Sequence, residues 1–167
     1  FPDLDSKLPK DLTMLKVDGK ITSPYFDEAT VFDGGSGLVA STEDYLKFAQ
    51  MLLNGGRLGD QRILSRKSVE LMSSNHLPES FASDAYLETA GSYRRGAGFG
   101  LTVGVILDPG KAGQYGSKGV YFWGGAASTI FWIDPEEELV AVLMTQLLGS
   151  SELLRETYSA LVYQAID

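Results

Sequence analysis

Hydrophobic residues recur at helical spacing in two stretches of the first half of the chain. The first stretch follows Ser41, whose hydroxyl can cap a helix while Asp44 answers the cap three residues later. Asn54-Gly55-Gly56 supplies residues that end helices. The predicted packed face consists of Tyr45, Phe48, Ala49 and Leu52. This pattern predicts a helix from about Ser41 to Asn54.

A second, shorter helix is predicted to begin at the Ser65 cap and to turn Val69 and Met72 inward. Pro78 then opens a loop that runs to about Gly98. Residues 1–30 are irregular, because three prolines and a glycine break any period there. We expect loops in that stretch, with at most a short hairpin around Asp18-Gly19.

The last third of the chain changes to the alternation that is typical of strands. Alternating side chains from Phe99 to Leu107 predict one strand, and Asp108-Pro109-Gly110 predicts the turn after it. Tyr121 and Trp123 mark a second strand, which Gly124-Gly125 breaks or bends.

Two further strands, 129–133 and 139–144, flank the turn sequence Asp134-Pro135-Glu136-Glu137. Short connections favour antiparallel pairing. A final helix is predicted after a cap at Ser151, with apolar positions at Leu153, Leu154, Tyr158, Leu161, Val162 and Ile166. The predicted fold class is α/β of the α+β kind: an antiparallel sheet with the C-terminal helix across one face and a separate helical segment.

Composition narrows the possible partners. The chain has 167 residues, 44% of them hydrophobic, which is enough for one domain with a core. Its net charge of -8 disfavours nucleic acid and anionic membranes as partners. The absence of cysteine excludes disulfides and thiolate metal sites. No apolar stretch is long enough to span a bilayer. We expect a soluble bacterial protein, cytoplasmic or exported, and the compartment stays open.

Several spaced motifs then occur in a fixed order. They are Gly34–Phe48, Met51–Gly56, Gly98–Leu101, Trp123–Gly125 and Met144–Gln146. In this order they resemble the C-terminal portion of the β-lactamase-related serine hydrolases, over about residues 30–165. Tryptophan at the head of the third motif is most similar to the family VIII carboxylesterases, since class C β-lactamases and penicillin-binding proteins usually have lysine there and several peptidases have histidine. The resemblance implies a β-lactamase/penicillin-binding-protein-like fold.

The catalytic groups of such enzymes are missing from this sequence. The resemblance implies a serine nucleophile in Ser-x-x-Lys and a tyrosine in Tyr-x-Asn or a similar motif, acting through an acyl-enzyme. No serine here precedes a lysine at that spacing; Ser92 precedes Arg95, which stays protonated. The nearest tyrosine motif, Tyr115-Gly116-Ser117, has the wrong place in the order. We therefore expect residues 1–167 to form one partial domain, inactive alone, whose N-terminal part is absent.

The resemblance assigns the remaining site residues. The backbone amide of Ala126, directly after the third motif, would be one donor of the oxyanion hole, with the nucleophile and base outside this chain. Trp123, Gly124 and Gly125 would line the substrate; a tight strand bend and a core aromatic are the alternative readings. Without the lysine, a substrate carboxylate loses its attractive partner, which favours neutral esters over β-lactams and peptide C-termini.

Other candidate residues give weaker indications of function. His76 is expected to be a helix-end or surface residue, and Gly34-Gly35-Ser36-Gly37 fits neither a phosphate loop nor a nucleophile elbow. Glu136-Glu137-Glu138 is expected to be a solvated turn rather than a metal site, and Arg94-Arg95 a surface pair. No cofactor or metal is predicted.

Two classes of function remain open. One is the C-terminal part of an ester-cleaving serine hydrolase, with a β-lactamase or D-peptidase as the alternative enzyme. The other is a non-catalytic binding or assembly module. In either case a bare strand edge and apolar sheet face are expected, so we predict a partner half or self-association.

Overall fold

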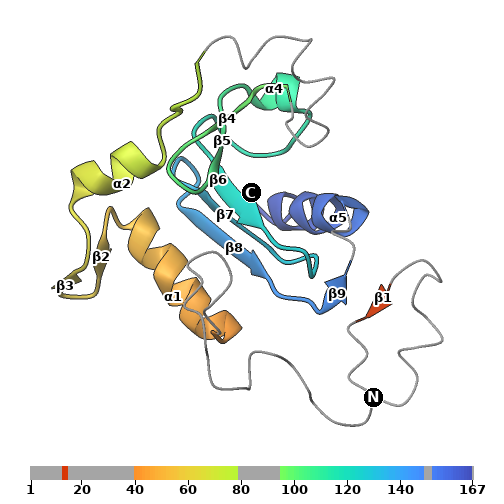
Figure 1. Cartoon of the computed structure of the whole chain (residues 1–167), viewed down its shortest axis with the longest axis horizontal. Helices are drawn as coiled ribbons and strands as arrows, with labels where there is room; N and C mark the ends of the chain where they lie inside the picture. The colour runs from red at the N-terminus through yellow and green to blue at the C-terminus, as the bar shows by residue number, and fades with distance from the viewer. Residues whose placement is uncertain (1–12, 15–39, 79–94, 149–151, 167) are drawn as a thin grey trace, which may run out of the picture.

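A five-stranded antiparallel sheet forms the centre of the protein (Figure 1). The computed structural model describes residues 13–14, 40–78, 95–148 and 152–166. In sheet order the strands are β4 (Ala97–Phe99), β5 (Gly104–Ile106), β6 (Tyr121–Gly124), β7 (Ile130–Asp134) and β8 (Leu139–Leu143). Helix α1 (Thr42–Leu53) and helix α5 (Glu152–Tyr163) lie on opposite sides of this sheet. The predicted α+β class is confirmed.

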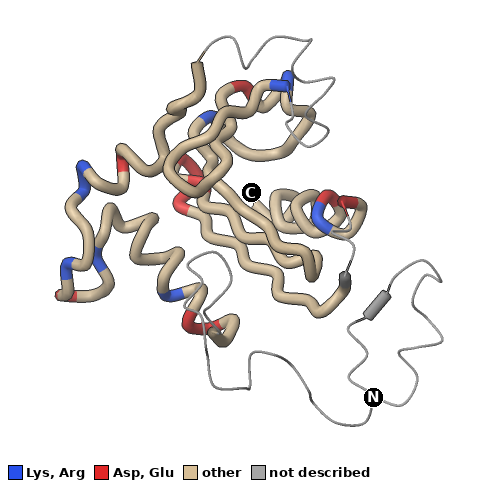
Figure 2. The backbone as a smooth tube through the Cα atoms, in the orientation of Figure 1, with Lys and Arg blue, Asp and Glu red and all other residues tan. Residues whose placement is uncertain are grey.

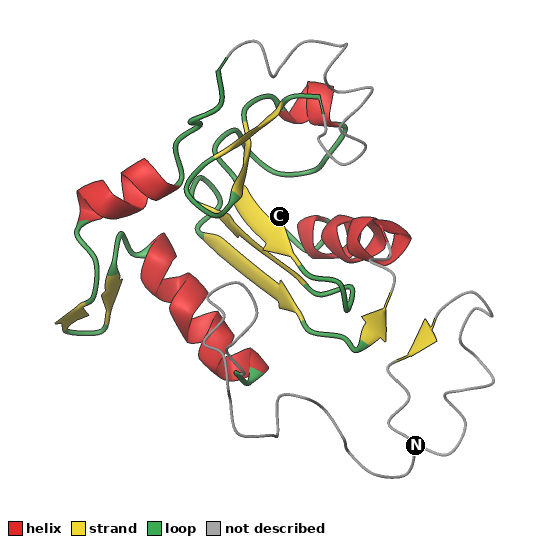
Figure 3. Ribbon diagram, in the orientation of Figure 1, coloured by secondary structure: helices red, strands yellow, loops and turns green. Residues whose placement is uncertain are grey.

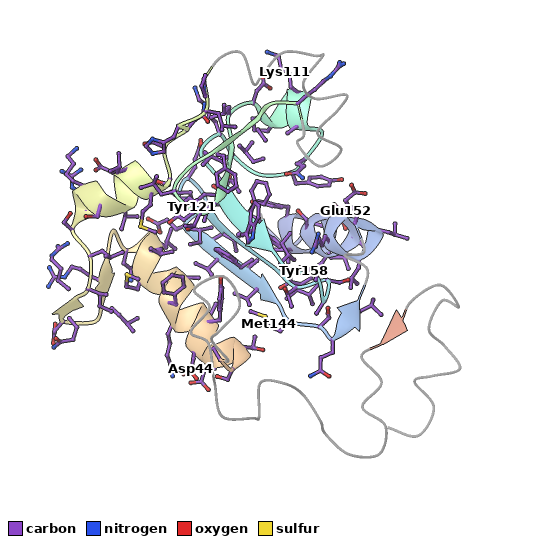
Figure 4. The ribbon with its side chains drawn as sticks, in the orientation of Figure 1. Asp44, Lys111, Tyr121, Met144, Glu152 and Tyr158 are labelled. Carbon is purple, nitrogen blue, oxygen red and sulfur yellow. The ribbon has the colours of Figure 1, made fainter. Side chains whose placement is uncertain are left out.

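Alternation along β7 divides the core between the two helices. Phe131 and Ile133 belong to a cluster that contains Ala49 and Leu52 of α1. Trp132 belongs to the other cluster, against which Tyr158 and Val162 of α5 pack. Figure 4 shows Tyr158 between α5 and the sheet. Because successive strand residues point to opposite faces, one strand anchors both layers.

The predicted N-caps of both early helices are confirmed. Ser41 accepts a hydrogen bond from the Asp44 amide at 3.1 Å at the start of α1. Ser65 does the same for Ser68 at 3.0 Å at the start of α2 (Arg66–Met72). Phe48 departs from the prediction: it is 44% exposed and contacts the Tyr45 ring edge-on. Met51, which was not predicted to face inward, is buried.

Four small strands lie outside the central sheet (Figure 3). After α1, β2 (Arg57–Leu58) and β3 (Gln61–Arg62) form a small hairpin. Near the other end of the sheet, β1 (Thr13–Met14) pairs with β9 (Leu147–Leu148). The expected hairpin at Asp18-Gly19 and the Ser151 cap lie outside the described residues.

The single strand predicted from Phe99 to Leu107 is wrong. It is a hairpin, in which β4 and β5 pair antiparallel with Phe99 opposite Gly104. The turn closes where Gly100 donates its amide to the Val103 carbonyl at 2.8 Å, and Thr102 adopts a left-handed φ of 74°. The predicted turn at Asp108 is also wrong, because Asp108 caps a short helix, α4 (Pro109–Ala112), by accepting from the Lys111 amide. Proline at the first helical position fits this role.

Helix α5 turns only part of its predicted apolar set inward. Tyr158 and Val162 of this set pack on the sheet, whereas Leu153 and Leu161 are 74% and 60% exposed. Tyr163, which was not predicted to face inward, also packs there. Charged residues gather on the helices and the β2–β3 hairpin (Figure 2), and β5, β6 and β8 contain none. In the part of the chain that the structure describes, no helix has the length and apolar character needed to cross a membrane.

Asp134 joins the end of β7 to α5. Its carboxylate is fully buried and accepts from the Tyr163 hydroxyl at 2.9 Å and the Ser117 amide at 3.0 Å. The amides of Glu136 and Glu137 donate to its other oxygen. Burial, with the hydrogen bond to and the charge of Asp134, raises the pKa of the Tyr163 hydroxyl. This one carboxylate therefore closes a turn and anchors a helix.

Tyr121 predicts a loss of stability at alkaline pH. Burial raises the pKa of Tyr121 to about 12, whereas an unfolded tyrosine ionises near pH 10. The stability contributed by the neutral buried phenol is thus fully present below pH 10 and is lost as pH rises towards 12. We expect Tyr121 to account for about 2 kcal/mol of the fall in unfolding free energy across this window. Urea titrations from pH 9 to 12 should show a shallower fall for Tyr121→Phe; an identical fall would contradict the prediction.

Candidate functional site

The second half of β6 has an open edge. Strand β5 pairs with β6 only at Tyr121 and Phe122. On its other side β6 continues to pair with β7, with Trp123 opposite Phe131 and Gly124 opposite Ile130. The backbone of Trp123 and Gly124 therefore has a sheet partner on one side alone among the described strands. Such an edge can accept an extended or planar ligand group.

A tight turn follows this edge. The Ser128 amide donates to the Gly125 carbonyl at 3.0 Å, and the Gly125 amide donates to the Thr129 carbonyl at 3.0 Å. Ser128 has a left-handed φ of 61°, so Ala126, Ala127 and Ser128 form a three-residue hairpin loop of a common kind. Within the described ranges, no acceptor bonds the Ala126 amide. This amide is available to a ligand.

Hydrogen bonds to the segment after β8 hold this turn in place. Ser128 is fully buried, and its hydroxyl donates to the Leu147 carbonyl at 2.7 Å. The Leu147 amide donates to the Ala127 carbonyl at 3.1 Å, and the Thr145 hydroxyl donates to the same oxygen. The Met144–Gln146 motif thus supplies part of the support for the turn after the third motif. A left-handed serine costs about 1–2 kcal/mol, so these contacts are needed to hold it.

The two motif glycines are required by neighbouring protein atoms. A β-carbon at Gly124 would lie 2.9 Å from the Thr129 carbonyl oxygen and 3.0 Å from Arg155 Nη2. A β-carbon at Gly125 would lie 2.6 Å from the Thr129 hydroxyl oxygen. Crowding at the strand bend is therefore sufficient to explain both glycines. Both glycines also line the cavity described below.

A cavity of about 800 Å³ lies against this edge, between the β4–β6 strands and α5. Its walls include the backbone from Trp123 to Ala126 and, from α5, Arg155. The aromatic lining consists of Phe99, Tyr115, Phe122, Trp123, Trp132 and Tyr163. Cavities of this size with mostly apolar walls hold small organic molecules. The two glutamates of its wall, Glu152 and Glu156, come from the start of α5; Glu152 is labelled in Figure 4.

Trp123 stands at the rim of this cavity. Its side chain is 48% exposed, and its ring meets Phe99 edge-on at 5.2 Å between centroids. Asn75 holds Phe99 in place, because its side-chain oxygen accepts from the Phe99 amide at 3.0 Å. Phe99 is part of the Gly98–Leu101 motif, so that motif supports the third one across the sheet edge. The core-aromatic reading of Trp123 does not fit its exposure.

The other titratable candidates lie away from the Ala126 amide. Tyr121, next to the motif, is buried in the core cluster shared with α1, and burial raises the pKa of its hydroxyl. His76 is exposed at the end of α2, with Nε2 at 2.8 Å from the Leu71 carbonyl oxygen. The Gly34–Gly37 segment and Arg94 lie outside the described residues. Across residues 40–78, 95–148 and 152–166, no three acidic or histidine side chains gather as a metal site.

Arg155 is a site residue that the sequence analysis missed. It projects from α5, and its Nη2 donates to the Gly125 carbonyl at 2.7 Å and to the Thr129 carbonyl at 3.2 Å. Its Nη1 donates to Glu152 at 2.9 Å. The spacing of Glu152 and Arg155 predicts only an intrahelical pair. The contact with the turn, 30 residues away in sequence, had no local signal.

Known proteins match this chain in sequence and in fold. A family model described as Beta-lactamase matches residues 4–164. Protein Rv1367c of Mycobacterium tuberculosis is 32% identical over 126 residues, covering 74% of this chain and 31% of that protein. The chain therefore spans about a third of the length of this curated relative.

Two solved structures share the fold at lower identity. EstCE1, described as a hydrolase with promiscuous acyltransferase activity, gives a TM-score of 0.68 at 24% identity, covering 91% of this chain and 38% of EstCE1. The LovD9 mutant of simvastatin synthase from Aspergillus terreus gives 0.65 at 23% identity, covering 92% and 40%. The sheet with flanking helices is thus a β-lactamase-like fold.

Proposed function

Because the chain belongs to the Beta-lactamase family, we propose that it is the C-terminal part of a serine hydrolase that cleaves carboxylic esters. The observation that carries the proposal is the Ala126 amide, which has no acceptor in the described part of the chain and borders a cavity walled by aromatic rings. In this proposal the Ala126 amide is one oxyanion donor and Trp123 is a wall of the substrate cleft. One such donor contributes roughly 3–4 kcal/mol of transition-state stabilisation.

The proposed reaction has two acyl-transfer steps. A serine hydroxyl from the segment that precedes the matched motifs attacks the ester carbonyl, and a base takes its proton. The carbonyl oxygen becomes an oxyanion that the Ala126 amide stabilises, and the alcohol leaves after receiving a proton. Water then attacks the acyl-enzyme through the same steps, which releases the acid and restores the serine. The name of EstCE1, a hydrolase with promiscuous acyltransferase activity, is consistent with acyl chemistry on this fold.

The experiment compares two forms of the protein. We expect the 167-residue chain alone to give no saturable hydrolysis of p-nitrophenyl butyrate, because Ser-x-x-Lys is absent. We expect the longer protein with its preceding segment to hydrolyse this ester and to be labelled covalently by a fluorophosphonate. Labelling without ester turnover, together with hydrolysis of the β-lactam nitrocefin, would favour a β-lactamase. No labelling of the longer protein would favour the binding-module alternative, which the missing nucleophile motif supports.

We also propose that a further strand pairs with the outer edge of the central sheet. β8 pairs only with β7 among the described strands, so its outer edge is free for a strand from the preceding segment or from a second copy. Light scattering of the 167-residue chain should then show association, and a stable monomer would contradict this.

Trp123 predicts the charge of the substrate. In the longer protein, Trp123→Lys should raise the ratio of kcat/KM for a carboxylate-bearing ester to that for its neutral methyl ester about fivefold, since a half-exposed ion pair contributes up to about 1 kcal/mol. Trp123→Phe keeps an aromatic ring without charge and is the matched control, with no change in this ratio. Equal ratios for the wild type and Trp123→Lys would argue against a substrate at this rim.

A further inference from the structure

We propose that Arg155 is a positioning residue for the Ala126 amide: its guanidinium orients and polarises the peptide group that joins Gly125 to Ala126. The proposal rests on the proposed function, because it concerns the same oxyanion donor. It adds a side chain from α5 to a site that the motifs place entirely on β6 and the turn after it.

The contact is made to the other end of the same peptide group. Arg155 Nη2 lies 2.7 Å from the Gly125 carbonyl oxygen, and that carbonyl shares its peptide plane with the Ala126 amide. In a trans peptide the N–H points away from the C=O, so a carbonyl held towards Arg155 aims the Ala126 N–H away from that guanidinium. The guanidinium also donates to the Thr129 carbonyl at 3.2 Å. One planar group therefore contacts both ends of the turn.

Charge strengthens this arrangement. A hydrogen bond from a cation is roughly twice as strong as a neutral one, and it withdraws electron density from the carbonyl that accepts it. Linked hydrogen bonds polarise one another by about 10–30% per bond. The Gly125 carbonyl also accepts from the Ser128 amide at 3.0 Å. Two donors on this oxygen make the Ala126 N–H a better donor to a developing oxyanion.

The surroundings of Arg155 fix its side chain. It is 14% exposed, and Glu152 holds its Nη1 at 2.9 Å. Gly124 leaves room for it, since a β-carbon at that position would lie 3.1 Å from Arg155 Cζ. Arginine does not lose its proton at any working pH, so this support is constant. With 14% of its side chain exposed, Arg155 is not part of an open surface anion site.

The test uses the longer protein with p-nitrophenyl butyrate as substrate. Arg155→Met should lower kcat about tenfold to hundredfold, as supporting residues of catalytic groups typically do, with KM within twofold of the wild type. Arg155→Lys keeps the charge and one donor direction and should recover part of kcat. Lys111→Met removes one exposed positive charge on α4 and should leave kcat unchanged.

A second variant shows whether Arg155 acts through the amide. Ala126→Pro removes the N–H at the position of the turn where proline is favoured, and it should lower kcat about 10²–10³-fold. In that background Arg155→Met should have no further effect on kcat. Equal effects of Arg155→Met in both backgrounds would overturn the proposal. Arg155 would then have only a structural role, in holding α5 against the turn. No effect of Ala126→Pro would instead refute the oxyanion role of Ala126 itself.

An NMR measurement on the conservative variant tests the proposal even where Arg155→Met folds poorly. In Arg155→Lys, the Ala126 amide proton should move to lower chemical shift, because a weaker hydrogen bond at the Gly125 carbonyl leaves the N–H less polarised. An unchanged amide shift together with unchanged kcat in Arg155→Lys would overturn the proposal.

Discussion

Asp134→Ala should lower the free energy of unfolding by about 4 kcal/mol. The substitution leaves the Tyr163 hydroxyl and the amides of Ser117, Glu136 and Glu137 without their common acceptor, in hydrogen bonds that are partly buried. Each buried donor left unsatisfied costs about 1–3 kcal/mol, of which water entering the new cavity recovers a part. Urea unfolding followed by circular dichroism measures the loss.

Tyr163→Phe is the matched control for that loss. It removes one hydrogen bond to the same carboxylate and should cost about 2 kcal/mol. The difference between the two variants then reports the contribution of the turn amides. Equal losses would show that the amides of Ser117, Glu136 and Glu137 contribute nothing, which would contradict the structural role assigned to Asp134.

Gly100→Ala should destabilise the protein by about 3 kcal/mol or more and should loosen the rim of the cavity. A β-carbon at Gly100 would lie 2.0 Å from the Met72 carbonyl oxygen, which is a backbone atom at the end of α2 and cannot rotate away. The same oxygen accepts from the Leu101 amide at 2.9 Å. The substitution must therefore separate the β4–β5 hairpin from α2, and large losses of this kind come from overpacking.

The control for Gly100→Ala is another glycine with free space around it. In Gly110→Ala the new β-carbon meets only Asp108 Oδ1, at 3.4 Å, and alanine favours the short helix α4. We expect its unfolding free energy to stay within about 0.5 kcal/mol of the wild type. If Gly100→Ala were as stable as Gly110→Ala, the close packing of the hairpin on α2 would be wrong.

Local signals explain which parts of the fold could be predicted from the sequence. The caps at Ser41 and Ser65 act within three residues of themselves, and both helices begin as expected. The strand Tyr121–Gly124 ends at the glycine pair for an equally local reason. The β4–β5 hairpin was missed because apolar residues continue to alternate through its four-residue turn, although Phe99 pairs with Gly104 and therefore points to the opposite face from Val105. Only the left-handed Thr102, which alternation does not encode, reverses the chain there.

Tertiary contacts explain what the sequence did not predict. Leu153 and Leu161 have helical spacing but lie on the exposed side of α5, because the face that packs on the sheet is the one with Tyr158 and Val162. The position of Trp123–Ala126 followed from ordered motifs, whereas Arg155 reaches them only because α5 crosses the sheet. A residue that supports a site from a distant helix has no pattern of its own.

In the role proposed for Arg155, its bond to the Gly125 carbonyl also affects when a newly made protein can become active. The ribosome delivers the turn first and the arginine 30 residues later, which takes about 2–6 seconds at the usual speed of synthesis. During that interval the nascent chain has the Ala126 amide but not the cation that orients it. Under the proposed function, ester cleavage by a protein still attached to the ribosome should therefore begin only after α5 has emerged and docked.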